Sequence, residues 1–178
     1  MKKGVIISGN LAQDHEFIYP FYRILEEKAE LDVCLIGGKP VLGFLGTNLP
    51  PNKNHPVKDI NQVEADKYDL LVLPGGVKAM EKIRQDERII KFISNFNDHK
   101  KIIACICSGA QLLISAGIVK GKKIAGYYSM KDDIINAGAI YTDLPAVVDG
   151  KIITTAHYKD LGPWMKAVLE VNEKQNSN

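Results

Sequence analysis

One stretch of the chain, residues 101–117, constrains the fold more than any other. Its first half is an apolar run that is rich in β-branched residues and too short for a core helix, so it predicts a buried strand. Beyond Gly109 the apolar residues fall at helical spacing, and Gly117 supplies a C-terminal stop. The pattern therefore places Cys107 at a sharp turn from a strand into a helix.

This position gives Cys107 a chemical interpretation. The first amides of the following helix point back at the sulfur, and the helix dipole favours negative charge there, so we predict a stabilised, nucleophilic thiolate. The serine elbow of hydrolases exposes its nucleophile by the same kind of turn. A buried structural cysteine is the alternative, and we interpret Cys34 and Cys105 in that way because both lie inside apolar strand runs.

The composition is that of an ordinary globular domain. The 178 residues are 46% hydrophobic and 25% charged, and the net charge of +2 is too small to indicate nucleic-acid binding. No apolar run approaches the roughly 20 residues that span a bilayer. Three cysteines, without a signal peptide after Met1, favour a reducing, cytoplasmic location. We predict a single domain over residues 1–172 and a frayed polar tail over 173–178.

Strands and helices alternate along the chain, and this order predicts a mostly parallel sheet with helices on both faces. A strand–helix–strand unit comes first, with the helix beginning near Ile18 so that Pro20 falls in its first turn. A β-hairpin at an edge of the sheet is expected over residues 39–56. The remaining predicted elements are a strand from Asp69 to a glycine turn, a two-part helix, the strand that leads to Cys107 and the helix after Gly109. Further strands are predicted at 122–127 and 139–141, a helix at 131–136, a hairpin at 146–156 and a final helix from about Gly162.

Three predicted strand ends meet at the rim that carries Cys107. Glu16 follows the first strand, the Gly75-Gly76 pair follows the third, and His157 follows the last hairpin. A carboxylate beside a cysteine can share its proton, and the amides of Gly76, Val77 and Ser108 could hold an oxyanion. Each group also has a structural interpretation: a helix N-terminal charge, a strand-to-helix turn and an exposed loop histidine, respectively.

Neither metal binding nor nucleotide binding is indicated. The histidines and cysteines lack metal-ligand spacing, and the glycine pairs at 37–38 and 75–76 do not form a nucleotide-binding pattern. We therefore expect no cofactor.

Five segments occur in a characteristic order: Glu16–Arg23, Tyr68–Gly76, Ala104–Gly117, Lys131–Gly138 and Val147–Gly150. Together they resemble the PfpI family, the intracellular-protease-I branch of the superfamily that includes the parkinsonism-associated DJ protein and the class-I glutamine amidotransferase domains. The resemblance implies a flavodoxin-like three-layer sandwich that forms a homodimer or a larger assembly.

The resemblance also implies roles for individual residues. It makes Cys107 the elbow nucleophile, Glu16 the acid bonded to its sulfur, and the Gly75-Gly76 turn a source of oxyanion amides. Glu81 is similar to the family's glutamate that reaches a neighbouring subunit's site. Peptidase-like members have a histidine directly after the nucleophile, whereas this chain has Ser108 there.

This departure weakens the peptidase interpretation, because a hydroxyl of ordinary pKa is no general base near neutral pH. The family's arginine beside the last hairpin is also missing, with Ala156 near its place. In the amidotransferase relatives a histidine at the end of a corresponding strand activates the cysteine. We therefore hypothesise that His157 is the base here.

The main functional prediction is a stress-related enzyme, similar to glyoxalase III or to deglycases, that acts on small electrophilic carbonyls or their adducts. Cys107 would attack the carbonyl, and Glu16 would move the protons. One alternative is an intracellular cysteine peptidase or amidase, for which the substrate would be a peptide. Another is a non-enzymatic redox sensor or holdase chaperone in which Cys107 is oxidised. The last is a relative of the fold that has lost its chemistry.

Overall fold

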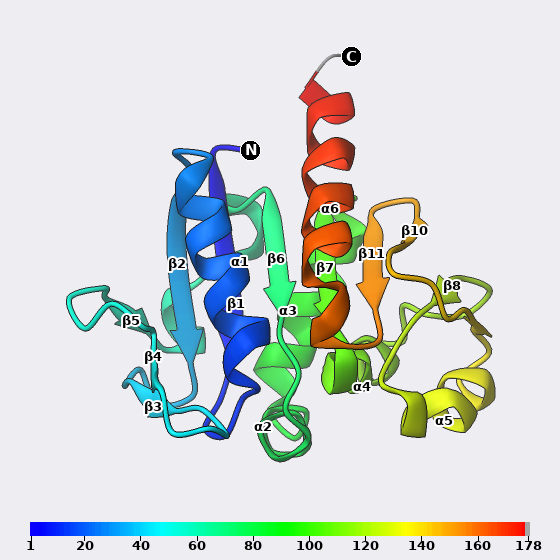
Figure 1. Ribbon diagram of the computed structural model, residues 1–178, viewed down its shortest axis with the longest axis horizontal. Coiled ribbons are helices and arrows are strands. Elements are labelled where there is room, and N and C mark those ends of the chain that lie inside the picture. Colours follow the sequence, from blue (N-terminus) through cyan, green and yellow to red (C-terminus); the bar gives the residue numbers. More distant parts are fainter. Residues whose placement is uncertain (177–178) are drawn as a thin grey trace.

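The computed structural model describes the backbone of residues 1–176 and the side chains of residues 1–174. At its centre is a seven-stranded sheet with the order β10-β11-β7-β6-β1-β2-β5 (Figure 1). Neighbouring strands pair in parallel, except that β10 is antiparallel to β11. The strands of this sheet are β1 (Lys3–Ser8), β2 (Glu30–Leu35), β5 (Val57–Lys58), β6 (Leu70–Leu73), β7 (Ile102–Ile106), β10 (Val147–Asp149) and β11 (Ile152–Thr155).

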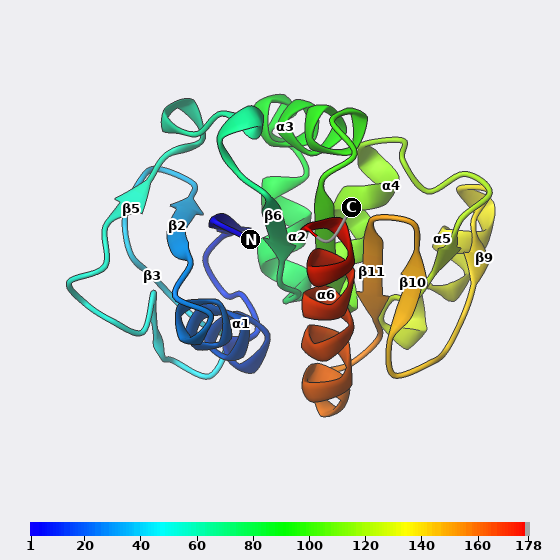
Figure 2. The same cartoon turned by 90° about the horizontal axis from the view of Figure 1, so that it is seen from above.

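Helices cover both faces of the sheet, as Figure 2 shows. α1 and α6 lie on one face, and α3 and α4 lie on the other. The predicted fold class, an α/β sandwich of three layers with a mostly parallel sheet, is therefore confirmed. The helices are α1 (Asp14–Glu26), α2 (Val77–Ile83), α3 (Glu87–Asp98), α4 (Ala110–Ser115), α5 (Lys131–Asn136) and α6 (Leu161–Asn176).

The central strands can be covered on both sides because they carry apolar side chains at consecutive positions. Every residue of β6 and β7 is buried, as expected for strands with helices on each face. α1 buries Phe17, Phe21 and Ile24, and α6 buries Trp164, whose indole Nε1 donates to the carbonyl of Ile153 at 3.1 Å. Because α1 and α6 pack on the sheet in this way, the first turn of each helix is held next to the carboxyl ends of the strands.

Helix α1 begins earlier than predicted. Gln13 is its N-cap and accepts a hydrogen bond from the His15 amide, so the helix starts at Asp14 and Pro20 lies within its second turn. A proline there leaves the carbonyl four residues earlier, that of Glu16, without its usual intrahelical donor. The predicted start near Ile18 was wrong because the cap at Gln13 outweighs the preference of proline for the first turn.

Two short pairs of strands lie outside the main sheet. The predicted hairpin at 39–56 is confirmed as β3 (Val41–Leu42) and β4 (Asn48–Leu49), which pair antiparallel. It does not extend the edge of the main sheet; instead its turn packs against the start of α1. β8 (Lys123–Ile124) and β9 (Ile140–Tyr141) form a small parallel sheet, so the predicted strand at 122–127 is only two residues long.

The C-terminal helix extends into the segment that we predicted to be a polar tail. α6 continues to Asn176, so residues 173–176 are helical, and residues 177–178 of that tail lie outside the described residues. Within the described part of the chain, no helix combines the length and the apolar character that crossing a membrane requires.

Candidate active site

Cys107 lies directly after β7, at the first position of a 3₁₀ turn, η3 (Cys107–Gly109), that leads into α4. Its backbone φ is 59°, in the left-handed region that side chains other than glycine rarely adopt. Gly109 permits this turn, because a Cβ there would lie 2.7 Å from the carbonyl oxygen of Leu73. Cys107 thus lies at a sharp turn from a strand into a helix, as the sequence predicted, and its role as an elbow nucleophile stays a prediction.

The side chains of Glu16 and Cys107 approach each other beside Gly75. The Glu16 side chain comes from the first turn of α1, is fully buried, and accepts a hydrogen bond at Oε2 from the Gly75 amide at 2.8 Å. A Cβ placed on Gly75 would lie 2.3 Å from Glu16 Oε2 and 3.1 Å from Cys107 Sγ, so the carboxyl and the sulfur share the space beside this glycine. Glu16 Oε1 is buried and has no hydrogen-bond partner among the described residues.

The environment of the sulfur opposes its ionisation. Burial, and next the neighbouring charge of Glu16, raise the pKa of Cys107 to about 12, whereas the hydrogen bond from the Ser108 amide lowers that pKa by less. Burial also raises the pKa of Glu16 to about 7, against the lowering effect of the Gly75 amide. The Ser108 amide thus favours the thiolate, as the sequence predicted, while burial and the Glu16 charge oppose it, so a nucleophilic thiolate at Cys107 stays a prediction.

Cys107 and Glu16 consequently titrate as a pair. Two adjacent negative charges in a buried site are unfavourable, so once the pair has lost its first proton it holds the second to a higher pH than a free thiol does. When Glu16 holds that proton, its carboxyl is neutral and no longer repels a negative charge on the sulfur, so a thiolate can form. When the thiol holds it, Glu16 is a base placed to remove it.

The glycine turn contributes differently from what the sequence predicted. The Gly75 amide is engaged by Glu16, so it positions the carboxyl and is not free for an oxyanion. Gly76 has a φ of 101°, and a Cβ there would lie 2.6 Å from the Gln13 amide nitrogen. Among the described residues we find no hydrogen bond from the Gly76 amide. The amides of Gly76 and Ser108 therefore stay candidates for an oxyanion hole.

His157 borders the same pocket as Cys107 but is oriented by other contacts. Its Nδ1 accepts a hydrogen bond from the Lys159 amide at 3.2 Å, and its ring lies 4.0 Å from the ring of Tyr158. In the neutral ring this bond leaves the proton on Nε2, which then faces a ligand as a donor. No hydrogen bond joins His157 to Cys107 in the described part of the chain. The base role predicted for His157 is therefore not supported by this geometry.

A single pocket of about 430 Å³ brings most of the predicted residues together. Cys107, Glu16, Gly76, Ser108 and His157 all line it. Sequence reasoning missed other side chains of its wall, which come from the β3–β4 turn, α2, α4 and the segments after β8 and β11: Phe44, Lys78, Gln111, Tyr127 and Tyr158. The adjacent tyrosines at 127–128 and the apolar pair at 44–45 within a glycine-rich turn were the available signals.

Glu81 lies outside this pocket. It is exposed on α2, and its carboxylate is 3.9 Å from Nζ of Lys78, which does line the pocket. Its predicted contact with a neighbouring subunit stays a prediction.

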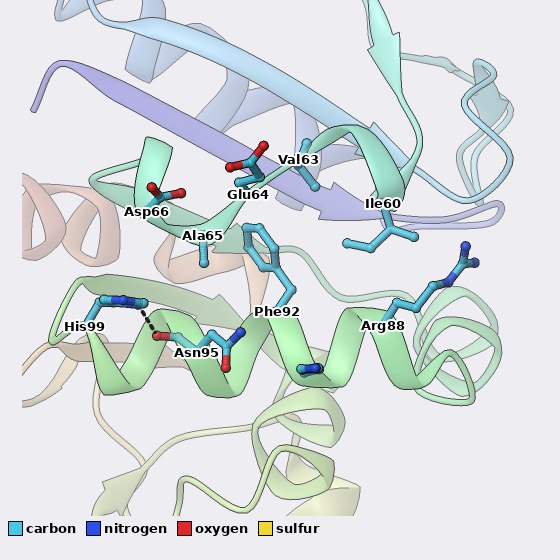
Figure 3. A pocket seen from close by; sticks show the side chains of 10 residues that line it. Ile60, Val63, Glu64, Ala65, Asp66, Arg88, Phe92, Asn95 and His99 are labelled. Carbon is cyan, nitrogen blue, oxygen red and sulfur yellow. Dashed lines mark hydrogen bonds between the residues drawn. The ribbon is translucent and has the colours of Figure 1, made fainter.

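A second hollow, of about 550 Å³, lies between α3 and the segment that contains the 3₁₀ turns η1 (Ile60–Gln62) and η2 (Ala65–Lys67) (Figure 3). Two of its polar side chains are already engaged: Arg88 with Asp86 and Asn61, and His99 Nδ1 with the carbonyl of Asn95 at 2.7 Å. The described residues that line this hollow include no cysteine and no buried carboxyl, so the Cys107 pocket is the better candidate site. The described residues contain no cluster of three or more side chains suited to hold a metal ion.

Known proteins resemble this chain along nearly its whole length. A profile of the DJ-1/PfpI family matches residues 2–171. Deglycase PfpI from Pyrococcus furiosus is 34% identical over 169 residues, which cover 95% of this chain and 98% of that protein. YraA from Bacillus subtilis, whose name assigns it provisionally to the cysteine proteases, is 35% identical over 172 residues, covering 96% and 98%. The crystal structure of Drosophila melanogaster DJ-1beta matches with a TM-score of 0.85 at 24% identity, covering 96% of this chain and 90% of that one. The chain belongs to the DJ-1/PfpI family.

Proposed function

We propose that the chain is a cysteine-dependent, stress-related enzyme that acts on small electrophilic carbonyls or on their adducts with amines or thiols. The observation that carries this proposal is the buried Glu16 carboxyl beside Cys107 in a pocket of about 430 Å³, a size that suits a small molecule. The name of the Pyrococcus furiosus relative, a deglycase, supports the same class of reaction.

The Cys107–Glu16 pair starts the reaction. Glu16 accepts the thiol proton while the sulfur attacks the carbonyl carbon, so a C–S bond forms and the C=O π electrons move to oxygen. The amides of Gly76 and Ser108 stabilise that oxyanion, and Glu16 then returns the proton to give a hemithioacetal.

The fate of the proton depends on the substrate. With a carbinolamine adduct, attack of the sulfur breaks the C–N bond, and Glu16 gives its proton to the departing nitrogen. With a dicarbonyl, one proton moves from the carbinol carbon to the neighbouring carbonyl carbon, and the hydroxyl proton moves from the carbinol oxygen to the neighbouring carbonyl oxygen. The first carbon then carries the thioester and the second a new hydroxyl. Water then hydrolyses the thioester, releasing a hydroxy acid and the Cys107 thiol.

Turnover of methylglyoxal and of its adduct with an amine tests this proposal. We expect Cys107→Ser to abolish turnover and Glu16→Gln to lower kcat by roughly 100-fold or more, because the proton carrier is lost. Cys34→Ala removes a buried thiol on β2, away from the pocket, and should keep wild-type kcat. Turnover that survives Cys107→Ser would overturn the proposal.

A cysteine peptidase is the second candidate, and the name of the Bacillus subtilis relative favours it. It needs a base separate from Glu16, and the hydrogen bond at Nδ1 of His157 argues against that histidine in this role. A chromogenic peptide in the same assay separates the two activities, since cleavage that depends on Cys107, without turnover of methylglyoxal, would establish the peptidase.

Self-association is a further part of the proposal. The family resemblance implies an assembly in which a glutamate reaches a neighbouring site, and Glu81 is exposed on α2, beside the pocket residue Lys78. Sedimentation of wild type and Glu81→Gln, together with kcat for each, tests whether this side chain acts across a subunit boundary.

A further inference from the structure

The turn of the β3–β4 hairpin is held rigidly against the start of α1. The Leu11 amide donates to the carbonyl of Leu42 at 2.8 Å, and the Phe44 amide donates to the carbonyl of Ala12 at the same distance. These bonds join the hairpin to the loop between β1 and α1. The backbone of Phe44 is thereby fixed beside the pocket, although its side chain is 67% exposed.

Asp14 strengthens this attachment from the first position of α1. Its buried carboxylate accepts the Leu45 amide at 2.7 Å and the Thr47 amide at 3.1 Å. Gly43 packs so closely that a Cβ there would lie 2.3 Å from Asp14 Oδ1. These bonds lower the pKa of Asp14 despite its burial, so the carboxylate stays ionised at neutral pH. The Asp14 side chain thus holds Gly43 and Leu45, the residues on either side of Phe44.

The mouth of the Cys107 pocket is rich in aromatic rings. Phe44 reaches it from the hairpin, and Tyr127, His157 and Tyr158 reach it from the segments after β8 and β11. The ring centroids of His157 and Tyr158 are 4.0 Å apart. Those of Tyr127 and His157 are 6.2 Å apart, and these two rings are stacked. The Tyr127, His157 and Tyr158 rings lie against one another, and Phe44 is held through its backbone. Aromatic faces that are exposed at such a site favour a planar ligand, because they can stack on it.

We propose that Phe44 and Tyr158 form a subsite that binds an aromatic group of the substrate next to its reacting carbon, and that Asp14 is the positioning residue for Phe44. This assignment of a substrate class rests on the proposed function. Carbonyls with an aromatic substituent are then preferred over small aliphatic ones, and the preference depends on the hairpin.

Alkylation of Cys107 tests the subsite without any turnover. The second-order rates with iodoacetamide and with its N-phenyl analogue, iodoacetanilide, give a ratio that reports recognition of the phenyl ring. We expect Phe44→Ala to lower this ratio roughly threefold to tenfold, the range for one aromatic pair. Leu45→Ala is the matched control, because Leu45 is 60% exposed on the same turn but does not line the pocket. An unchanged ratio in Phe44→Ala, or an equal fall in Leu45→Ala, overturns the proposal.

Asp14→Asn tests the positioning role. The variant should lower the same ratio in the wild-type background and leave it unchanged in the Phe44→Ala background, because Asp14 acts through Phe44. A general loss of structure would instead change both alkylation rates alike. A fall of the ratio by the same factor in both backgrounds contradicts the assignment.

Turnover of phenylglyoxal and methylglyoxal separates this inference from the proposed function. Phe44→Ala should raise KM for phenylglyoxal roughly threefold to tenfold more than it raises KM for methylglyoxal. If neither is turned over but the alkylation ratio still depends on Phe44, the subsite stands and the proposed function fails. If both are turned over and neither KM nor the ratio depends on Phe44, the subsite is refuted.

Discussion

Replacing Gly75 with alanine tests how closely the Cys107–Glu16 pair is built around this glycine. The new Cβ would lie 2.3 Å from Glu16 Oε2, 2.7 Å from Cys107 Cβ and 3.1 Å from Cys107 Sγ. The first contact is about 1 Å shorter than a normal one, so the carboxyl, the sulfur or the backbone between them must move by about that distance.

The cost follows from that displacement. Moving a positioned catalytic group by about 1 Å lowers the rate roughly 100-fold. The 2.8 Å hydrogen bond from the residue-75 amide to Glu16 is also disturbed, and a bond to a buried carboxylate contributes about 2 kcal/mol to stability. We therefore expect Gly75→Ala to lower kcat about 100-fold and the free energy of unfolding by about 2 kcal/mol.

Steady-state kinetics and urea denaturation measure the two effects. Gly162→Ala is the matched control: a Cβ there meets nothing within 4 Å, and Gly162 lies in α6 and does not line the Cys107 pocket. This control should keep wild-type kcat and should not lower the free energy of unfolding, because alanine is favoured over glycine in a helix. If Gly75→Ala also keeps wild-type kcat and the wild-type rate of Cys107 alkylation, the close approach of carboxyl and sulfur that we infer is refuted.

Three further predictions concern single side chains. Burial raises the pKa of Glu16 from its ordinary value of 4.5 to about 7 in the folded protein, so wild type should lose about 3 kcal/mol of stability as the pH rises from 4.5 to 7. Glu16→Gln should lack this loss in thermal melts, and parallel curves would contradict the prediction. His157→Gln should leave the pH profile of Cys107 alkylation unchanged, because Nδ1 is engaged by the Lys159 amide, whereas a shifted profile would restore the base hypothesis. The pKa of Asp32 is lowered by hydrogen bonds from two lysines and a tyrosine, so Asp32→Asn should cost about 2 kcal/mol at neutral pH and less as the pH falls below 4, as chemical denaturation would measure.

The fold was predictable where local pattern and tertiary packing agree. The apolar runs at β6 and β7 are buried on both faces, and the helix that follows Cys107 begins where its spacing indicated. The start of α1 was missed because a single cap, Gln13, decides it. The strand expected at 122–127 is short because β8 pairs only with β9, a pairing that its own sequence does not encode.

The candidate site was predictable in its residues but not in its electrostatics. The sequence places Glu16, Cys107 and His157 at the ends of parallel strands, and the structure brings all three to one pocket. Whether the sulfur is ionised depends on burial and on the facing carboxyl, which are properties of the packed site. Phe44 was missed because its approach to the pocket depends on bonds between the hairpin and Asp14, which are distant in sequence.

Titration of the Cys107 sulfur tests the central claim, that Cys107 and Glu16 hold one proton between them, most directly. The ultraviolet absorbance of the thiolate, measured against pH in wild type and in Glu16→Gln with Cys107→Ser as the blank, reports its ionisation. We predict that ionisation of the wild-type pair is completed only near pH 12, and that Glu16→Gln completes it at lower pH because the repelling charge is gone. Identical titration curves for wild type and Glu16→Gln would contradict the shared proton.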